Sequence, residues 1–212
     1  DWTAFSTASL PPAAVAAGGT YFLSSLQSKQ YVSSARVYIT VADPAGAVES
    51  VQPPASPSAQ NMQDLATLFT AQAITTAVYK QLGLPVGSAG SVTAAPLQGS
   101  GSTPTSFLVV TATSGSATRA AQLVNTYVAV FLSSRRSAQA ARASMDAAGD
   151  LRALHTLTRD PANQPERQTL LTQYASLQAL AHNPSAGAVP ISTAVPASAP
   201  SSPKPTRNAI LG

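Results

Sequence analysis

The side chains that most often carry catalytic chemistry are few in this chain, and their spacing matches no catalytic motif. His155 and His182 are the only histidines, and no His-Glu-x-x-His, Cys-x-x-Cys or paired-histidine spacing accompanies them. No Gly-x-Ser-x-Gly turn surrounds any of the many serines, so no serine nucleophile is indicated. His182 is predicted to lie at a helix end, where a cation interacts favourably with the helix dipole.

The interior aspartates are equally scattered along the chain. They are Asp43, Asp64, Asp146, Asp150 and Asp160. Glycoside hydrolysis requires two carboxyl groups that face each other across the substrate, and the sequence brings no obvious pair together. We therefore expect a protein that is not an enzyme, with no catalytic residue, no cofactor and no metal site.

Arginine is the charged residue that recurs along one predicted helical region. Its positions there are Arg135, Arg136, Arg142 and Arg152, with Arg159 close by. A guanidinium group forms paired hydrogen bonds to carboxylates, so these arginines are candidates for contact with an acidic glycan or with a facing protomer. A solvated helix face is the alternative that the residues leave open.

Charge and composition limit the class of protein. The net charge is +4, but no cluster of Lys and Arg exceeds the pair Arg135 and Arg136, which argues against nucleic-acid binding. Cysteine is absent, so there is neither a disulfide framework nor a thiolate metal site. Charged residues make up 9% of the chain, against about 25% in average soluble domains, and aromatic residues make up 6%. We expect one modest hydrophobic core with long Pro-, Ser- and Gly-rich segments at its edges.

A strand followed at once by an amphipathic helix organises the rest of the chain. The β-branched run 107–113 predicts the strand, and Ser116 is a candidate N-cap for a helix over 116–131. The apolar positions of this helix recur every three or four residues and share one face. They are Ala120, Leu123, Val124, Tyr127, Val128 and Phe131.

Three more strands are predicted. Alternation over 31–41 predicts a strand with Ser33, Ala35, Val37 and Ile39 on its apolar face. Residues 90–97 predict a short strand. Residues 188–197 predict a strand confined to the edge of a sheet, because proline cannot donate a hydrogen bond to a neighbouring strand.

One helix is predicted over 61–82, after an expected loop over 45–60. Asn61 is its candidate N-cap, and Gly83 and Pro85 end it. Its buried positions are expected to be Leu65, Phe69, Ala73, Ala77 and Val78.

Beyond Phe131 the sequence becomes rich in Ala, Arg and Ser, which favour a helix but offer little to bury. The helix is expected to continue over 133–150 and to project from the core or rest on a neighbouring chain, with Gly149 as a candidate interruption. A second helix is predicted over 166–182, and its apolar residues have heptad-like spacing. They are Leu170, Tyr174, Leu177 and Ala181. The two helices predict a helical hairpin, an arm over 133–182.

The two ends of the chain lack regular patterns. From Trp2 to Ser28 there is no charged residue, and the stretch is weakly apolar. Two interpretations stay open for residues 1–28: a flexible tail, or the remnant of a first membrane anchor, degraded by Pro11 and Pro12. The C-terminal stretch 198–212 is Pro-rich and basic. Its characteristic residues are Pro200, Pro203, Lys204, Pro205 and Arg207.

These elements predict an α+β (α/β) fold. We expect a small mixed sheet covered by helices, a projecting helical hairpin and a Pro-rich terminal tail. The chain divides into an N-terminal weakly apolar segment, 1–28, a domain over 29–197 that includes the arm, and the terminal stretch 198–212.

Four passages, in a fixed order, carry a resemblance to a known family. They are Ser25-Leu-Gln27 with the strand 31–39; residues 65–84, ending in Leu82-Gly-Leu84; residues 107–131, containing Ala120-Ala-Gln-Leu-Val-Asn125; and residues 194–211, containing Ala194-Val-Pro196 and Ser202-Pro-Lys-Pro-Thr-Arg207. Together they resemble the polysaccharide co-polymerase family. These are the Wzz-type chain-length determinants, which are also found as the membrane-adaptor part of bacterial tyrosine kinases.

The resemblance implies a two-helix inner-membrane protein whose middle domain faces the extracytoplasmic side and assembles into a homo-oligomeric ring. Such proteins influence the chain length, polymerisation or export of a surface polysaccharide (capsule, exopolysaccharide or O-antigen-like) without catalysis. The implied partners are a polysaccharide polymerase or export machinery and, in some cases, a cytoplasmic tyrosine kinase. No Gly-rich phosphate-binding loop is present, so kinase activity is not expected of this chain.

In this interpretation the stretch 198–212 is a stiff approach to a second membrane helix that begins near Asn208, with its cations near the membrane surface. It predicts that Tyr31 and Val195 lie in neighbouring strands and that both ends of the chain leave on one side. The alternative is a secreted cell-envelope glycan-binding domain. That alternative predicts a monomer with a concave polar groove, and Pro- and Ser-rich ends that act as spacers.

Overall fold

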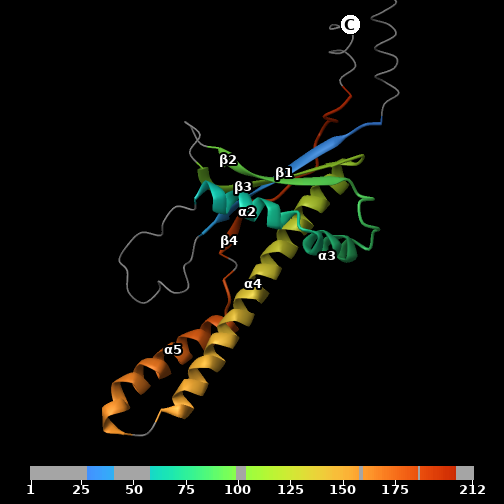
Figure 1. Cartoon of the computed structure of the whole chain (residues 1–212). Helices are drawn as coiled ribbons and strands as arrows, with labels where there is room; N and C mark the ends of the chain where they lie inside the picture. Colours follow the sequence, from blue (N-terminus) through green and yellow to red (C-terminus); the bar gives the residue numbers. More distant parts are fainter. Residues whose placement is uncertain (1–27, 41–57, 99–103, 158–159, 186, 204–212) are drawn as a thin grey trace, which may run out of the picture.

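The computed structural model describes residues 28–40, 58–98, 104–157, 160–185 and 187–203, and Figure 1 shows their arrangement. A sheet lies at one end of the molecule, and a long helix runs from it to the tip of a two-helix arm (Figure 1). The strands are β1 (Tyr31–Ile39), β2 (Ser91–Gln98), β3 (Pro104–Ser114) and β4 (Ala188–Ser192). The helices are α2 (Ala59–Phe69), α3 (Gln72–Leu82), α4 (Ala117–Thr156) and α5 (Gln164–His182), with a short 3-10 helix (Pro161–Asn163) at the tip of the arm.

The four strands have the order β2-β3-β1-β4, and each neighbouring pair is antiparallel. The predicted α+β class with its helical cover and projecting hairpin is confirmed, and the sheet is antiparallel throughout rather than mixed. Alternation in β1 buries Ser33, Ala35, Val37 and Ile39, as predicted. The register pairs Val37 with Leu108, both fully buried, so β1 and β3 present one continuous apolar face.

The helices α2 and α4 lie on this apolar face of the sheet, and α3 packs against α4 (Figure 1). The opposite face carries exposed or half-exposed residues of β1, among them Val32, Ser34 and Arg36. The rings of Tyr38 and Phe107 pair across β1 and β3 on that face, with their centroids 5.2 Å apart. The sheet is therefore covered on one side by the described helices.

Strand β4 occupies an edge of the sheet, as its prolines predicted, but it is shorter than predicted and ends at Ser192. Its register against β1 shifts between Arg36 and Val37. At the shift the Arg36 backbone N–H donates to the Ser192 side-chain hydroxyl at 3.0 Å, so a side chain replaces a backbone acceptor. The predicted strand 188–197 thus gives way after five residues to an extended segment held by side chains.

The single helix predicted over 61–82 is wrong, because the structure has two helices that separate at Thr70 and Ala71. The first, α2, packs on β2 and β3, whereas the second, α3, packs on α4. The Thr70 hydroxyl bonds to the Thr67 carbonyl and the Thr75 hydroxyl to the Thr70 carbonyl, which satisfies backbone groups at the break. One straight helix cannot pack in both directions, so tertiary contacts determine the break.

The start of α2 and its buried face also differ from prediction. Ser58 rather than Asn61 is the N-cap, and its Oγ accepts from the Asn61 N–H at 3.2 Å. Ala59 and Gln60, assigned to the expected loop, are helical, and the rest of that loop up to residue 57 lies outside the described residues. Because the helix is broken, the residues that face the core differ from those expected of one continuous helix. The buried residues of the two helices are Met62, Ala66, Phe69, Val78 and Tyr79, whereas Ala73 and Ala77 are exposed.

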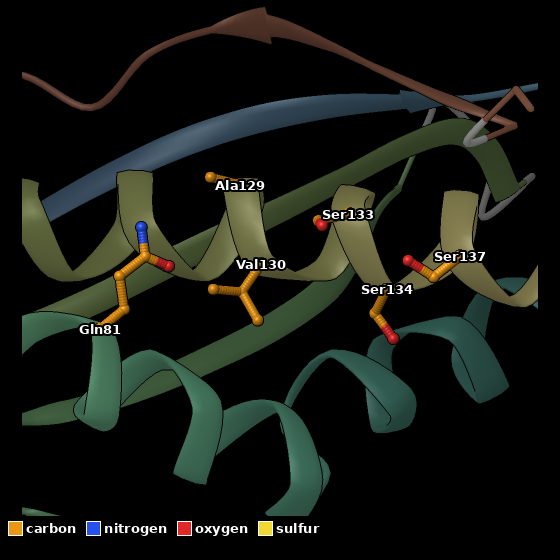
Figure 2. Close-up of a pocket in the computed structure, with 6 residues that line it drawn as sticks. All are labelled: Gln81, Ala129, Val130, Ser133, Ser134 and Ser137. Atoms are coloured by element: carbon orange, nitrogen blue, oxygen red, sulfur yellow. The ribbon is translucent and has the colours of Figure 1, made fainter. Parts of the chain in front are cut away.

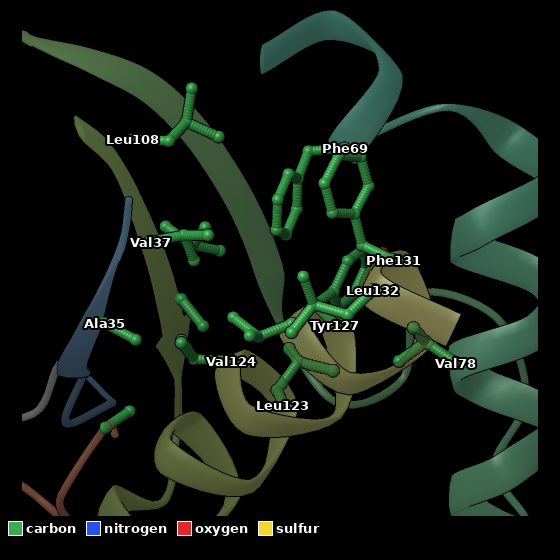
Figure 3. Close-up of a cluster of buried hydrophobic side chains, with 14 of the residues drawn as sticks. Ala35, Val37, Phe69, Val78, Leu108, Leu123, Val124, Tyr127, Phe131 and Leu132 are labelled. Atoms are coloured by element: carbon green, nitrogen blue, oxygen red, sulfur yellow. The ribbon is translucent and has the colours of Figure 1, made fainter. Parts of the chain in front are cut away.

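The predicted organising unit of strand and helix is confirmed. Ser116 is the N-cap of α4, and all six predicted apolar positions of that helix are buried. Figure 3 shows Phe69 of α2 against Phe131 of α4, with the strand residues Val37 and Leu108 beside them. The two phenylalanine rings stack with centroids 3.9 Å apart and planes 24° apart. The core therefore depends on aromatic packing between α2 and the first half of α4.

The second half of α4 and the whole of α5 form the arm, so the predicted hairpin is confirmed (Figure 1). The helix α4 passes through Gly149 without interruption, so the predicted break there is wrong. Small side chains bring the helices together, because Ala143 and Ala147 are buried while α5 has no fully buried residue. At the tip, the Arg167 guanidinium donates to the Leu154 and Leu157 carbonyls at 3.2 and 3.3 Å and caps the end of α4.

The hydroxyl of Tyr127 links α4 to α3 and gives a prediction for alkaline pH. It donates to the Thr75 hydroxyl at 3.0 Å, and its burial raises the pKa of Tyr127 above its ordinary value. The native state therefore holds this proton to a higher pH than the unfolded chain does. Stability from this group is full below about pH 10 and falls as the pH rises from there through the native pKa.

Replacing Tyr127 by Phe is expected to cost about 1 kcal/mol at neutral pH through loss of the bond to Thr75. The variant should also lose less stability than the parent at alkaline pH, because phenylalanine has no hydroxyl group to deprotonate. Urea unfolding of both proteins at a series of pH values from neutral to strongly alkaline measures this, and the two stability curves should converge as the pH rises. Parallel curves would contradict the prediction.

Candidate functional site

A cavity of about 630 Å³ lies where the arm joins the domain, and we call it the junction cavity. Four elements contribute to it: the end of α2, the start of α3, the middle of α4 and the last turns of α5 with the residues before β4. The lining residues are Leu68, Ala71, Ala73, Ile74, Phe131, Ser134, Arg135, Ala138, Gln139, Arg142, Ala143, Asp146, Leu177, Leu180, Ser185 and Gly187. Its volume is in the range of small-molecule sites, and its wall is apolar with a few polar groups.

The guanidinium of Arg135 has a defined position in this cavity. Its carbon lies 5.8 Å from the centre of the Phe131 ring, within cation–π distance. A Cβ added to Gly187 would lie 3.1 Å from Nη2 of Arg135, so the glycine allows the guanidinium to approach the backbone. Gly187 is buried and has φ +58, a conformation that also favours glycine. Phe131 and Gly187 thus orient Arg135 from two sides.

Burial lowers the pKa of Arg135, and the positive charge of Arg142 lowers it further. Arginine nevertheless remains protonated under ordinary conditions. The described cavity lining carries two arginines and one carboxylate, that of Asp146, so its net charge is positive and favours an anion between the arginines.

The polar residues of the cavity form a stripe along α4. Arg135, Gln139, Arg142 and Asp146 follow one another at i, i+4, i+7 and i+11, which places them on one face of the helix. The Oε1 atom of Gln139 is buried and has no hydrogen-bond partner among the described residues. The stripe spans roughly 16 Å along the helix axis. Its groups can donate hydrogen bonds from the arginines and accept them at Asp146, and a rotation of the Gln139 side chain would present a further acceptor.

The structure separates the four arginines proposed from the sequence into two pairs. Arg135 and Arg142 line the junction cavity, whereas Arg136 and Arg152 are exposed residues of α4 outside its lining. Arg159 lies outside the described residues. Gln139, Gly187 and the leucines of α5 were missed. The i, i+4, i+7 spacing of Arg135, Gln139 and Arg142 is the signal in the sequence that points to Gln139.

The two histidines lie at opposite ends of the arm, each in the last turn of its helix. His155 ends α4 near the tip and His182 ends α5 near the junction, and both are exposed. Neither lines the junction cavity. Within the described ranges, no three His, Asp or Glu side chains are grouped as a metal site would require. The position of His182 at a helix end agrees with the prediction.

A second hollow of about 420 Å³ lies between α3 and α4 (Figure 2). Figure 2 shows Ser133, Ser134 and Ser137 along α4, with Val130 beside them on the same helix and Gln81 on the facing helix. Its six lining residues include no histidine and no carboxylate, so a serine there has no base beside it. We therefore regard the junction cavity as the candidate functional site.

The described chain ends lie side by side at the end of the sheet that points away from the arm (Figure 1). Gln30 and Ser202 form an antiparallel bridge, with the Gln30 N–H donating to the Ser202 carbonyl at 2.8 Å. The Ser201 N–H donates to the Gln30 carbonyl at 2.7 Å. Val195 lies beyond the end of β4, and its carbonyl accepts from the Ser33 hydroxyl at 3.0 Å. The segment after β4 therefore follows β1 back to its start.

Pro200 and Pro203 belong to this paired segment, and each is half-exposed. Lys204, Pro205 and Arg207, the other residues of the proposed membrane-proximal motif, lie outside the described residues, as do residues 1–27.

Asn125 of α4 fastens the same segment. Its Nδ2 donates to the Ala194 carbonyl at 3.0 Å, and its Oδ1 accepts from the Ala194 N–H at 2.9 Å. The side-chain amide thus replaces a strand partner for both backbone groups of Ala194. Asn125 is also the last residue of the motif Ala120-Ala-Gln-Leu-Val-Asn125, so this motif has a structural role in holding the C-terminal segment.

Replacing Asn125 by Ala is expected to cost about 2 kcal/mol, because both backbone groups of Ala194 lose their partner. The loss of stability should be confined to the segment around Ala194. Hydrogen exchange at the Ala194 amide should accelerate by roughly tenfold or more, beyond any change shared by β3. Gln122→Ala, at an exposed position one turn earlier, is the matched control and should leave this amide unchanged. Equal acceleration of hydrogen exchange throughout the sheet would show that Asn125 does not stabilise the Ala194 segment specifically.

Across the described ranges, none of the helices combines the length and apolar character needed to cross a bilayer. No protein-family model matches the sequence, and no curated protein matches it. Among solved structures, the chain is similar to a full-length bacterial polysaccharide co-polymerase, with a TM-score of 0.40 and 11% identity. The alignment covers 94% of this chain and 87% of that one.

Proposed function

We propose that this chain is the extracytoplasmic domain of a membrane-anchored, non-catalytic regulator of the chain length, polymerisation or export of a surface polysaccharide. The observation that carries the proposal is the pairing of Gln30 with Ser202 at the end of the sheet opposite to the arm. Two anchors that flank this pair would lie next to each other in one membrane. The domain would then direct its arm away from that membrane.

The dimensions of α4 support this arrangement. A helix of 40 residues is about 60 Å long, and roughly its second half projects beyond the sheet (Figure 1). Such an arm is suited to contacting a growing glycan or neighbouring subunits at a distance from the membrane. Residues 1–28 and 198–212 are proposed to lead to the two anchors, and residues 29–197 to form the domain.

The surface of the arm supports assembly into a homo-oligomer, which we propose to be a ring. Met145, Leu151 and Leu171 are exposed on the arm, with 71%, 41% and 46% of their surface accessible. Because few described side chains of the arm are fully buried, a neighbouring arm that covered these residues would add to its stability. The proposed partners are a polysaccharide polymerase or export machinery in the same membrane and a tyrosine kinase on its cytoplasmic side.

The test uses the natural gene product in its native host. These 212 residues contain no cysteine, so an Ala175→Cys substitution on the exposed side of α5 adds a labelling site within the arm, and the protein without the substitution is the control for labelling elsewhere. We expect the protein in the membrane fraction, with the introduced thiol labelled by an impermeant maleimide from outside the cytoplasm. Deleting the gene should change the length distribution of a surface polysaccharide on gels. A freely released product, or an unchanged distribution, would contradict the proposal.

A secreted envelope glycan-binding domain is the second candidate, and the junction cavity would be its glycan site. A concave site with two cations and several hydrogen-bonding groups is compatible with glycan binding in either case. The fractionation experiment separates the two, because a secreted domain would be released without an anchor.

A further inference from the structure

We propose that the junction cavity binds an acidic sugar residue of a polysaccharide, with the sugar carboxylate between Arg135 and Arg142. This inference rests on the proposed function in one respect, because it names the glycan class that the regulator would recognise. It is carried by the composition and arrangement of one cavity wall.

The two guanidinium groups supply the recognition of the anion. Arg135 and Arg142 lie seven residues apart on α4, roughly 10 Å along its axis, and both line the cavity. Arg135 is already oriented by Phe131 and Gly187, so little side-chain entropy is lost when it binds a ligand. A carboxylate between the two cations would accept charge-assisted hydrogen bonds and relieve their mutual repulsion.

The acceptors between and beside these cations indicate a ligand that also carries hydroxyl groups. Gln139 lies between the arginines, and its buried Oε1 has no donor among the described residues, so rotation of this side chain towards a ligand hydroxyl would cost no existing hydrogen bond of that oxygen. Asp146 continues the stripe and offers a carboxylate, which accepts hydrogen bonds. Inorganic phosphate offers mainly acceptors, whereas a uronate residue carries hydroxyl donors beside its carboxylate. The pattern of donors and acceptors therefore matches an acidic sugar.

The facing wall suits the carbon skeleton of a sugar ring. Leu177 and Leu180 of α5 and Leu68 of α2 line the cavity from elements other than the helix that carries the polar stripe, and Leu68 has 55% of its surface exposed. A pyranose ring presents C–H groups on its faces, which pack against aliphatic side chains. The cavity is also bordered by both the arm and the domain, so an occupant would contact both.

The test is calorimetric titration of the 212-residue chain with a hexamer of galacturonic acid. A hexamer of glucose, hexaglutamate and inorganic phosphate are the comparison ligands. We expect binding of the acidic hexamer that weakens as salt is added, and at least roughly tenfold weaker binding of the other three. Equal binding of hexaglutamate would overturn the proposal in favour of an acidic peptide, and equal binding of phosphate would reduce the cavity to a simple anion site. Failure of the acidic hexamer to bind would also overturn it.

The four arginines provide matched variants, since two line the cavity and two do not. Arg142→Gln should weaken binding by roughly tenfold or more, because it removes a charged hydrogen-bond donor at an exposed position where folding is not at stake. Gln139→Leu should weaken it as well. Arg136→Gln and Arg152→Gln, also at exposed positions, should change it by less than about twofold. Equal losses in Arg142→Gln and Arg136→Gln would show that binding follows net charge rather than the cavity.

The binding titration and the gene deletion together distinguish failure of this inference from failure of the proposed function. If the chain regulates polysaccharide length in the host but does not bind the acidic hexamer, the regulator proposal stands and the cavity assignment falls. If it binds the hexamer through Arg142 but gene deletion leaves polysaccharide length unchanged, the assignment stands and the regulator proposal falls.

Discussion

Replacing Phe69 by alanine is expected to destabilise the protein by about 3–5 kcal/mol. The ring is fully buried and stacks on Phe131 at 3.9 Å between α2 and α4. Alanine removes the stacking contact and leaves a cavity that the sheet and two helices cannot fill without moving. For a chain of this size each kcal/mol corresponds to roughly 2–4 °C of melting temperature, so thermal unfolding will report the effect as clearly as urea.

Two companion variants make this result interpretable. Phe69→Leu keeps much of the buried volume and should cost clearly less than alanine, which keeps the experiment informative if Phe69→Ala does not fold. Leu68→Ala changes the neighbouring residue of α2, whose side chain is 55% exposed, and should cost no more than about 1 kcal/mol. Similar losses from Phe69→Ala and Leu68→Ala would mean that the aromatic stack is not the centre of the core.

Replacing Gly90 by alanine is expected to cost more than about 3 kcal/mol, for two independent reasons. Gly90 has φ +133, a conformation that residues with a side chain rarely adopt. An added Cβ would also overlap the Thr113 carbonyl of β3, because the backbone approaches closely where β2 begins. Relief of the overlap would shift the β2–β3 pairing and the Gly90 carbonyl, which accepts from the Tyr79 hydroxyl at 2.9 Å.

Gly87 provides the control, since it separates backbone strain from overlap. It has φ +83, but an added Cβ there would have no heavy atom within 4 Å among the described residues. Gly87→Ala should therefore cost only about 1–2 kcal/mol, the ordinary penalty for a left-handed residue. Urea unfolding of both variants against the parent measures the difference. If the two losses are equal, the close approach of Gly90 to β3 contributes nothing.

The buried core and the arm differ in how they are stabilised. The domain relies on many large buried side chains such as Phe69, Phe131 and Leu108, whereas the described part of the arm buries only Ala143, Ala147 and Leu154 and adds the capping contacts of Arg167. The junction cavity lies at the boundary between these two regions. A ligand bound there would connect a strongly packed domain to a thinly packed arm, so its effect on the arm is measurable by hydrogen exchange along α5.

Local pattern alone determined most of the elements. Alternation over 31–41 predicted both β1 and its buried face, and prolines assigned the 188–197 region to a sheet edge. The three-and-four spacing after Ser116 predicted the buried side of α4, and heptad-like spacing predicted α5 and the hairpin. Each of these signals depends on residues within a few positions of one another. For this reason they are readable without knowledge of the fold.

The tertiary structure alone decided the features that depend on distant contacts. The break at Thr70 and Ala71 has no glycine or proline to announce it, and it exists because α2 packs on the sheet while α3 packs on α4. The fastening of Ala194 by Asn125 joins residues 69 positions apart. In the same way, the arginines were visible in the sequence, but only the return of the chain from α5 to β4 places Gly187 against Arg135 and encloses the cavity. Local spacing determines which residues share one face of a helix, whereas only packing between elements determines which residues contact that face.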